Sequence, residues 1–265
     1  MRVSESILII YFTYLSVAAG VRRVPASRIV RVIFAGVVAA TAVTLVRLAP
    51  ATPAMIAARD WLPAPLLLLA YFVTGACWIR PWTEAEAWLR AWDRRLVGDL
   101  QPDRIPRVIR TLLELLYTSC FVLIPAGLSV LVVGGRSDLA DHYWALVLAA
   151  ELGAFGMLPW IQTRPPWALE APRASDAVGF RRFSLLWVRR TSICVNTFPS
   201  GHAAGSLAVA LGVLPAAPVS AAVLAAMALT IAVASVVGRY HYVLDAITGV
   251  VLALVVWAAV SAAGV

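Results

Sequence analysis

The sequence contains no lysine and little charge of either sign. All 22 of its basic residues are arginine, and charged residues make up 14% of the 265 positions, whereas hydrophobic residues make up 62%. Soluble domains carry about 25% charged and about 45–50% apolar residues. This composition excludes an ordinary soluble domain and predicts an integral membrane protein.

Cysteine is equally scarce. Cys77, Cys120 and Cys194 show neither a CxxC pair nor a Cys/His spacing typical of metal sites, and the first two lie inside hydrophobic runs. Such cysteines most often serve as small buried apolar residues. We therefore expect no disulfide framework and no zinc site. Repeats at a solenoid period and low-complexity tracts are also absent from the sequence.

Long hydrophobic runs fill most of the chain. A membrane-spanning helix needs about 20 mostly apolar residues, and eight segments qualify, although the second is short and the sixth merges into the seventh. These segments are residues 3–21, 32–48, 61–79, 111–133, 143–162, 202–214, 219–237 and 245–263. The sequence predicts an all-α, polytopic membrane protein with six to eight transmembrane helices.

The first hydrophobic segment has a second interpretation. Arg2 and the small residues near Ala19 are also typical of a secretory signal peptide. More hydrophobic segments follow, so an uncleaved first helix is the prediction.

Polar residues gather in two loops, 81–110 and 163–200. The first contains "TEAEAWLRAWDRRL", in which apolar residues alternate with charges at roughly helical spacing: Ala87, Leu89, Trp92 and Leu96. This pattern predicts an amphipathic helix. It lies along the membrane surface or is an ordinary packed connecting helix.

Two of the three histidines occupy corresponding places. His202 follows "PSG" at the entrance of one hydrophobic segment, and His241 stands in "GRYHYVLDAITG" at the entrance of the last. If residues 219–237 cross back through the membrane, both histidines emerge on the same face. A lone histidine at a membrane boundary is usually an interfacial or packing residue. Two on one face indicate a common site.

His241 also has a candidate partner. Asp245 follows four residues later, so the two side chains would stack on one side of a helix, about 6 Å apart along its axis. A carboxylate at that separation accepts a hydrogen bond from an imidazole N–H, which fixes the tautomer and makes the other nitrogen more nucleophilic.

The turn before His202 suits an anion. Backbone N–H groups in the first turn of a helix, together with the helix dipole, favour negative charge, and Gly201 permits close approach of a ligand. Gly201 and Gly205 also form a small-xxx-small pair, whose alternative role is tight helix packing.

Three short motifs carry a family resemblance: "TRPP" at 163–166, "PSGH" at 199–202 and "HYVLD" at 241–245, the last extended back to Arg239. They resemble the signature motifs of the type 2 phosphatidic acid phosphatase superfamily of integral membrane enzymes, in the branch that includes inositol phosphorylceramide synthases. The resemblance implies a six-helix catalytic core within residues 61–265, with residues 1–60 forming additional N-terminal hydrophobic helices.

The resemblance also implies a mechanism. By that analogy His241 attacks phosphorus to form a phosphohistidine, Asp245 orients His241, and His202 protonates the leaving oxygen and then activates water or an alcohol. Ser200, the Gly201 N–H and basic side chains would bind the nonbridging oxygens. No metal and no cofactor is expected, because arginines hold the phosphate.

Two basic residues of the superfamily pattern are missing. Its lysine seven residues before the first-motif arginine is Met157 here, and its arginine six residues before the third-motif histidine is Ser235. Arg164 retains the first-motif arginine, and Arg239 is a candidate replacement. Arg190 is a further candidate among four arginines that alternatively face anionic lipid headgroups. These four are Arg181, Arg182, Arg189 and Arg190.

Two acids lie inside hydrophobic segments. Glu114 and Glu151 are costly in hydrocarbon, so they are functional candidates by default. A helix-to-helix hydrogen bond is the alternative, and neither residue joins the predicted catalytic set.

Arginine placement predicts an orientation. With eight spans, 18 of the 22 arginines fall in loops on the histidine side. Cytoplasmic loops carry the excess of basic residues in membrane proteins, so the site is expected to face the cytoplasm, whereas enzymes of this superfamily commonly act on the outer face. Arginines retained for phosphate binding would produce the same bias.

Three functions remain open at this point. A phosphatase acting on a lipid phosphate or diphosphate is favoured over a phosphotransferase, because the glycine of "PSGH" is common in the phosphatases. A lipid carrier or scaffold is the non-enzyme alternative, but the sequence shows no inverted repeat. The expected partners are a lipid phosphate and membrane lipids of the cell membrane, with no nucleic acid. The oligomeric state is not predicted.

Overall fold

The computed structural model describes residues 1–98, 102–170 and 179–264. Regular structure in that part of the chain is helical, with one isolated bridge between Thr163 and Asn196. The α-helices are α1 (Val3–Val21), α2 (Ala26–Leu48), α3 (Pro53–Trp61), α4 (Pro63–Thr74), α5 (Thr83–Val97), α6 (Arg107–Thr118), α7 (Cys120–Val133), α8 (Ala140–Phe155), α9 (Pro166–Leu169), α10 (Gly179–Thr191), α11 (Gly201–Val213), α12 (Pro218–Val237) and α13 (Val243–Ala262). Short 3₁₀ turns are η1 (Gly75–Cys77), η2 (Pro102–Arg104) and η3 (Ser137–Leu139).

Each of the eight predicted hydrophobic segments contains helix, but the bounds differ: α8 ends at Phe155, so the end of the predicted segment 143–162 is not helical, and 111–133 is divided between α6 and α7. In the described chain, five helical stretches are long and apolar enough to cross a membrane: α1, α2, α12, α13 and the combined stretch Pro53–Cys77. The α6–α7 pair, bent by 57°, adds a sixth if it is counted as one span. The shorter α8 and α11 run through the interior. The predicted all-α, polytopic membrane protein is confirmed.

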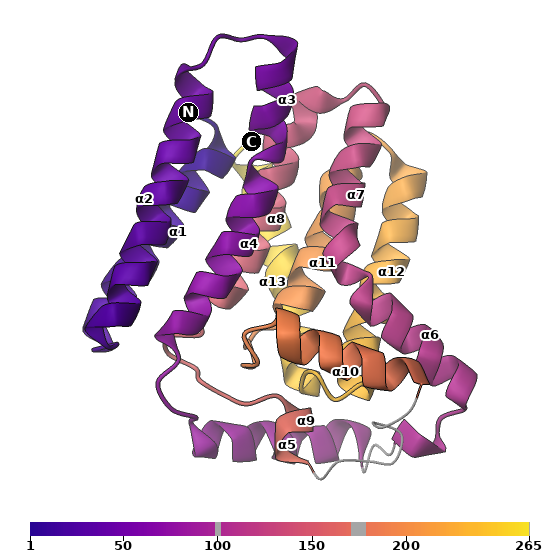
Figure 1. Cartoon of the computed structure of the whole chain (residues 1–265). Coiled ribbons are helices and arrows are strands. Elements are labelled where there is room, and N and C mark those ends of the chain that lie inside the picture. Colours follow the sequence, from indigo (N-terminus) through magenta and orange to yellow (C-terminus); the bar gives the residue numbers. More distant parts are fainter. Residues whose placement is uncertain (99–101, 171–178, 265) are drawn as a thin grey trace.

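Helix α11 lies at the centre of the bundle (Figure 1). It packs against α7, α8, α12 and α13, and most of its residues are buried. Its sequence is dominated by glycine and alanine, which let neighbouring helices approach closely. Gly249 of α13 makes one of these close contacts, since a Cβ there would lie 2.5 Å from the carbonyl oxygen of Ser200. Helix α13 therefore rests directly on the start of α11.

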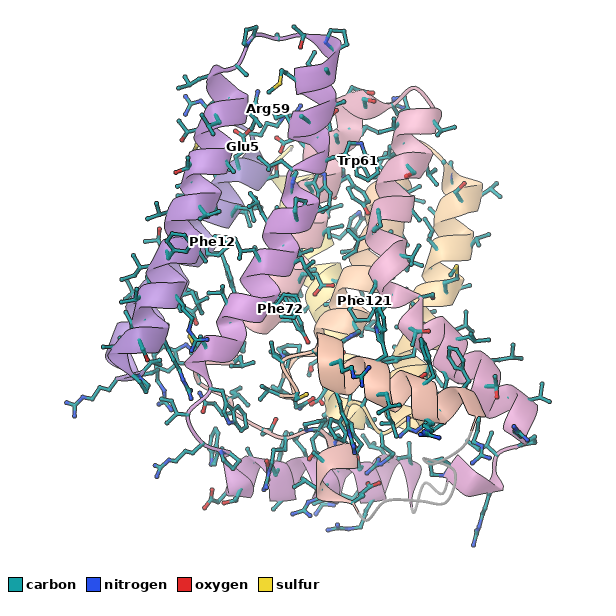
Figure 2. The ribbon with its side chains drawn as sticks, in the orientation of Figure 1. Glu5, Phe12, Arg59, Trp61, Phe72 and Phe121 are labelled. Carbon is teal, nitrogen blue, oxygen red and sulfur yellow. The ribbon has the colours of Figure 1, made fainter. Side chains whose placement is uncertain are left out.

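The N-terminal helices belong to the same packed body. Helix α1 packs against α2, α4 and α8. Arg59 of α3 donates from Nε to Oε1 of Glu5 in α1 over 2.6 Å, and Figure 2 labels this pair. Arg2 forms a second ion pair with Asp60 over 2.7 Å. Helices α1 and α3 are thus joined by two ion pairs at one end of the bundle.

Both chain termini lie at that end, and α5, α9 and α10 lie at the other (Figure 1). Helix α5 runs across the end of the bundle and packs against α13, as expected for a packed connecting helix. Its buried residues are Glu86, Leu89 and Asp93. An amphipathic helix usually buries only apolar residues, so the two buried acids of α5 need partners. Those partners lie in the candidate site.

Candidate active site

The two histidines meet, as predicted. His241 Nε2 lies 3.3 Å from His202 Nδ1, and the other ring nitrogen of His241, Nδ1, lies 3.4 Å from Oδ2 of Asp245. His241 and Asp245 are both buried. A proton on Nδ1 shared with the carboxylate leaves Nε2 with a free lone pair. The geometry thus presents one nitrogen of His241 for nucleophilic attack and places a second imidazole beside it.

The local structure around His241 differs from the predicted one. His241 does not share a helix with Asp245, because α13 starts at Val243. Asp245 instead accepts the backbone N–H of Tyr242 over 2.8 Å, in a capping box that closes the first turn of α13. The carboxylate therefore holds the backbone next to His241 and also faces its ring. The predicted contact between His241 and Asp245 is present, but the two residues are not stacked on one helix as the sequence had suggested.

Aromatic rings surround His202. The Tyr117 ring stacks on His202 with centroids 5.1 Å apart, and Phe121 meets it edge-on at 6.0 Å. Tyr117 also stacks on Tyr240 at 4.1 Å. Phe121 lies near the start of α7, just after the break from α6 (Figure 2). These aromatic residues were not predicted from the sequence, because stacking between distant helices leaves no local pattern.

The "PSGH" turn is tied into the fold. The Ser200 hydroxyl caps α11 by accepting the Ala203 N–H over 3.3 Å, and the Ser200 N–H donates to the Asp245 carbonyl over 2.9 Å. The Gly201 N–H lies 3.4 Å from Thr197 Oγ1. The second and third motifs are thus bonded directly to each other. Phosphate binding by Ser200 and Gly201 stays a prediction.

Arg164 of the first motif is held by α5. Glu86 accepts its backbone N–H, Nε and Nη2 over 2.8, 2.9 and 2.8 Å. Burial opposes ionisation of Glu86, but the hydrogen bonds from Arg164 hold the pKa of the carboxyl below its usual range. The Arg164 side chain remains 40% exposed. The same loop is fixed by Tyr242, which donates to the Arg164 carbonyl over 3.0 Å.

Arg239 lies between two carboxylates. Its Nη1 contacts Asp93 Oδ2 of α5 over 3.0 Å, and its Nε donates to Glu170 Oε1 over 2.8 Å. The other oxygen of Asp93 accepts the Val243 N–H over 2.8 Å. Asp93 therefore holds both sides of the short loop that carries His241. Neither Glu86 nor Asp93 was predicted, because their partners are far away in sequence.

The remaining predicted positions lie apart from the histidines. Arg190 is exposed near the end of α10, and in the described residues no hydrogen bond or ion pair joins it to the histidine pair. Met157 is 38% exposed, and the buried Ser235 donates to the Ala232 carbonyl over 2.8 Å. Phosphate binding by Arg164, Arg239 and Arg190 stays a prediction.

The described residues include no group of three or more His, Cys, Asp or Glu side chains arranged to hold a metal ion. His202, His241 and Asp245 form a row in which each contacts the next. The chemistry of such a row allows proton transfer between its members and nucleophilic attack by an imidazole nitrogen. Metal-free chemistry remains a prediction.

Burial makes His241 sensitive to acid. It lowers the pKa of His241 from 6.5 to about 4, so the unfolded chain binds a proton first when the pH falls. The free energy of unfolding should therefore decrease as the pH falls from about 6.5 toward about 4. We expect the thermal midpoint of the wild type to fall more steeply in this window than that of His241→Gln. An equal pH dependence of the thermal midpoint in the two proteins would contradict a lowered pKa at His241.

Comparison with known families agrees with the motifs. A family model described as the PAP2 superfamily matches residues 87–259, which include most of α5, the three motifs and both site histidines. Comparisons with curated proteins and with solved structures give no significant match. The family match covers more than half of the chain and ends within α13. The chain therefore belongs to the PAP2 superfamily, whose members are phosphatases or phosphotransferases.

Proposed function

We propose that this protein is a membrane-embedded phosphatase that acts on lipid phosphates or diphosphates through a phosphohistidine on His241, without a metal. The observation that carries the proposal is the row His202–His241–Asp245, with contacts of 3.3 and 3.4 Å. Asp245 holds the Nδ1 proton, so Nε2 is the attacking nitrogen.

In the first step, Nε2 attacks phosphorus and the bond from phosphorus to the leaving oxygen breaks. His202 gives a proton to that oxygen, which departs as the lipid alcohol, or as the lipid monophosphate when the substrate is a diphosphate. The two imidazoles, 3.3 Å apart, leave no room for a phosphoryl group between them. Substrate binding must therefore separate the rings before attack.

In the second step, His202 removes a proton from water, the water oxygen bonds to phosphorus, and the N–P bond to His241 breaks. Phosphate leaves and both histidines return to their starting states. We assign Arg164 to the nonbridging oxygens, because Glu86 engages only Nε and Nη2 of its guanidinium and the side chain is 40% exposed. Arg239 has fewer N–H groups left to bind phosphate, since two carboxylates already engage its guanidinium.

A phosphotransferase of the inositol phosphorylceramide synthase type is the second candidate. The same phosphohistidine would then pass its phosphoryl-containing group to an alcohol in place of water. A carrier or scaffold is less well supported. The bend between α6 and α7 is a broken helix, but an ordered His–His–Asp row has no evident role in carrying lipid.

Metal-free phosphate release tests the enzyme proposal. Purified protein in detergent, with a chelator present, is given isoprenoid, glycerol and sphingoid lipid phosphates. We expect phosphate release from at least one class. If none is cleaved, an acceptor alcohol is added: a new phospholipid indicates the transferase, and no product in either assay contradicts both enzyme proposals.

We also propose that the site faces the cytoplasm. Support comes from the arginine-rich loops, which lie at the end of the bundle that carries α5 and α10 (Figure 1). A cysteine introduced at the exposed Arg190 should resist an impermeant thiol reagent in intact cells and react after lysis. The control background replaces the exposed Cys194 with serine. Reaction in intact cells would contradict this orientation.

A further inference from the structure

The two intramembrane acids differ sharply in their surroundings. Glu114 of α6 is fully engaged: one carboxyl oxygen pairs with Arg181 Nη1 at 2.6 Å and the other accepts the Tyr240 hydroxyl at 2.7 Å. Glu151 of α8 is 7% exposed, and within the described part of the chain no hydrogen bond or ion pair engages its carboxyl. The sequence alone could not separate these two residues.

Glu151 lies against the first turns of α11. A Cβ at Gly205 would lie 1.8 Å from Glu151 Oε1, and a Cβ at Gly201 would lie 2.9 Å from Oε2. Glycine at both positions therefore makes room for the carboxyl group. Phe155, one turn along α8, also lies against Gly201, since a Cβ at Gly201 would lie 2.6 Å from Cε1 of its ring. The carboxyl thus lies directly behind the turn that presents His202.

An unpartnered carboxyl in this place is unfavourable for folding. Buried polar groups nearly always have a hydrogen-bond partner, and an acid in a hydrophobic segment of a membrane protein is a functional candidate by default. Buried polar groups that lack a partner within the protein are concentrated at functional sites. The missing partner of Glu151 is therefore best sought in the substrate.

We propose that Glu151 hydrogen-bonds a hydroxyl, ester or amide group of the lipid whose phosphate lies at His241. This inference rests on the proposed function. Gly205 lies about 6 Å further along α11 than Gly201, since a helix rises about 1.5 Å per residue. In this proposal the lipid runs along α11 from the phosphate into the bundle, so the carboxyl meets the part of the lipid next to the phosphate.

This placement selects a class of lipid. Glycerol and sphingoid phosphates carry hydrogen-bonding groups within a few bonds of the phosphate. Isoprenoid phosphates continue from the phosphate as hydrocarbon and offer no such group. The substrate is therefore a glycerol or sphingoid lipid phosphate.

The test compares Glu151→Leu, which removes the hydrogen bond, with Glu151→Gln, which keeps it. Phosphate release is measured from diacylglycerol phosphate, ceramide phosphate and an isoprenoid phosphate. For Glu151→Leu, we expect KM to rise by about tenfold or more for the preferred hydrogen-bonding lipid and to stay unchanged for the isoprenoid phosphate. Glu151→Gln should stay within about threefold of the wild type. Comparison of diacylglycerol phosphate with ceramide phosphate identifies which of the two lipid classes is used.

Thermal midpoints separate binding from packing. Replacing an unpartnered buried carboxyl by leucine should leave the midpoint unchanged or raise it. Glu114→Gln, which removes the charge that pairs with Arg181, should lower the thermal midpoint. A lower midpoint for Glu151→Leu, or an equal loss with every lipid, would make Glu151 a packing residue and overturn the inference.

The outcome for the wild type separates the two proposals. Cleavage of the isoprenoid phosphate alone would overturn the assignment of Glu151 and leave the phosphatase intact. If the wild type cleaves a glycerol or sphingoid phosphate and Glu151→Leu does so with unchanged KM and kcat, the assignment of Glu151 is likewise overturned and the phosphatase proposal stands. Failure to cleave any lipid phosphate, or to transfer to an added alcohol, would overturn the proposed function and this inference with it.

Discussion

Alanine at position 241 is expected to reduce turnover by at least about 10⁴-fold, because removal of a covalent nucleophile leaves only binding and charge stabilisation. No phosphoenzyme should form in this variant. The measurement is single-turnover phosphate release, with the thermal midpoint followed alongside to show that the protein is folded.

The third histidine provides the control. His142 lies in the first turn of α8, at the end of the bundle opposite the site (Figure 1). Its replacement by alanine should change turnover by less than about threefold, because it lies far from the reacting groups. Comparable losses in the two variants would show that His241 acts through stability rather than chemistry.

The second large effect is expected at Asp93. This buried carboxylate joins Arg239 and the Val243 N–H, one on each side of the loop that presents His241. Asp93→Asn keeps the shape but removes the charge, and disruption of a buried ion pair costs about 3–5 kcal/mol. We expect a clearly lower thermal midpoint and a fall in kcat that exceeds any change in KM, because the nucleophile is mispositioned.

Glu84 supplies the matched control for that experiment. It lies on the exposed side of the same helix, α5. Glu84→Gln removes one negative charge without breaking a buried ion pair, so its midpoint and kcat should match the wild type. Indistinguishable behaviour of Asp93→Asn and Glu84→Gln would contradict a role for α5 in holding the site.

The amino-acid sequence predicted where the helices occur better than where they bend or begin. Eight apolar segments were recognisable because hydrocarbon demands long apolar runs. The 57° bend at Ser119 was not, since no proline or glycine occurs at the break and Pro125 lies inside α7. The beginning of α13 at Val243 was also missed, because it depends on a cap formed by Asp245.

The site was predictable where its members are close in sequence or follow a motif. His241 and Asp245 are four residues apart, and His202 lies in a recognisable turn. The supporting residues come from elsewhere: Glu86 and Asp93 from α5 bond to Arg164 and Arg239. Such long-range ion pairs leave no periodic signal in the sequence. Only the packed structure distinguishes the acids that hold arginines from acids that are simply solvated.

The most direct measurement is to trap the phosphoenzyme. The protein is mixed with a lipid phosphate labelled at phosphorus, quenched in alkali, which preserves phosphohistidine, and digested for mass spectrometry. The proposed mechanism predicts one labelled site, at His241, with the label absent from His241→Ala and lost on a chase with unlabelled substrate. Label on another residue, or phosphate release at the wild-type rate without any labelled His241, would contradict the proposed mechanism.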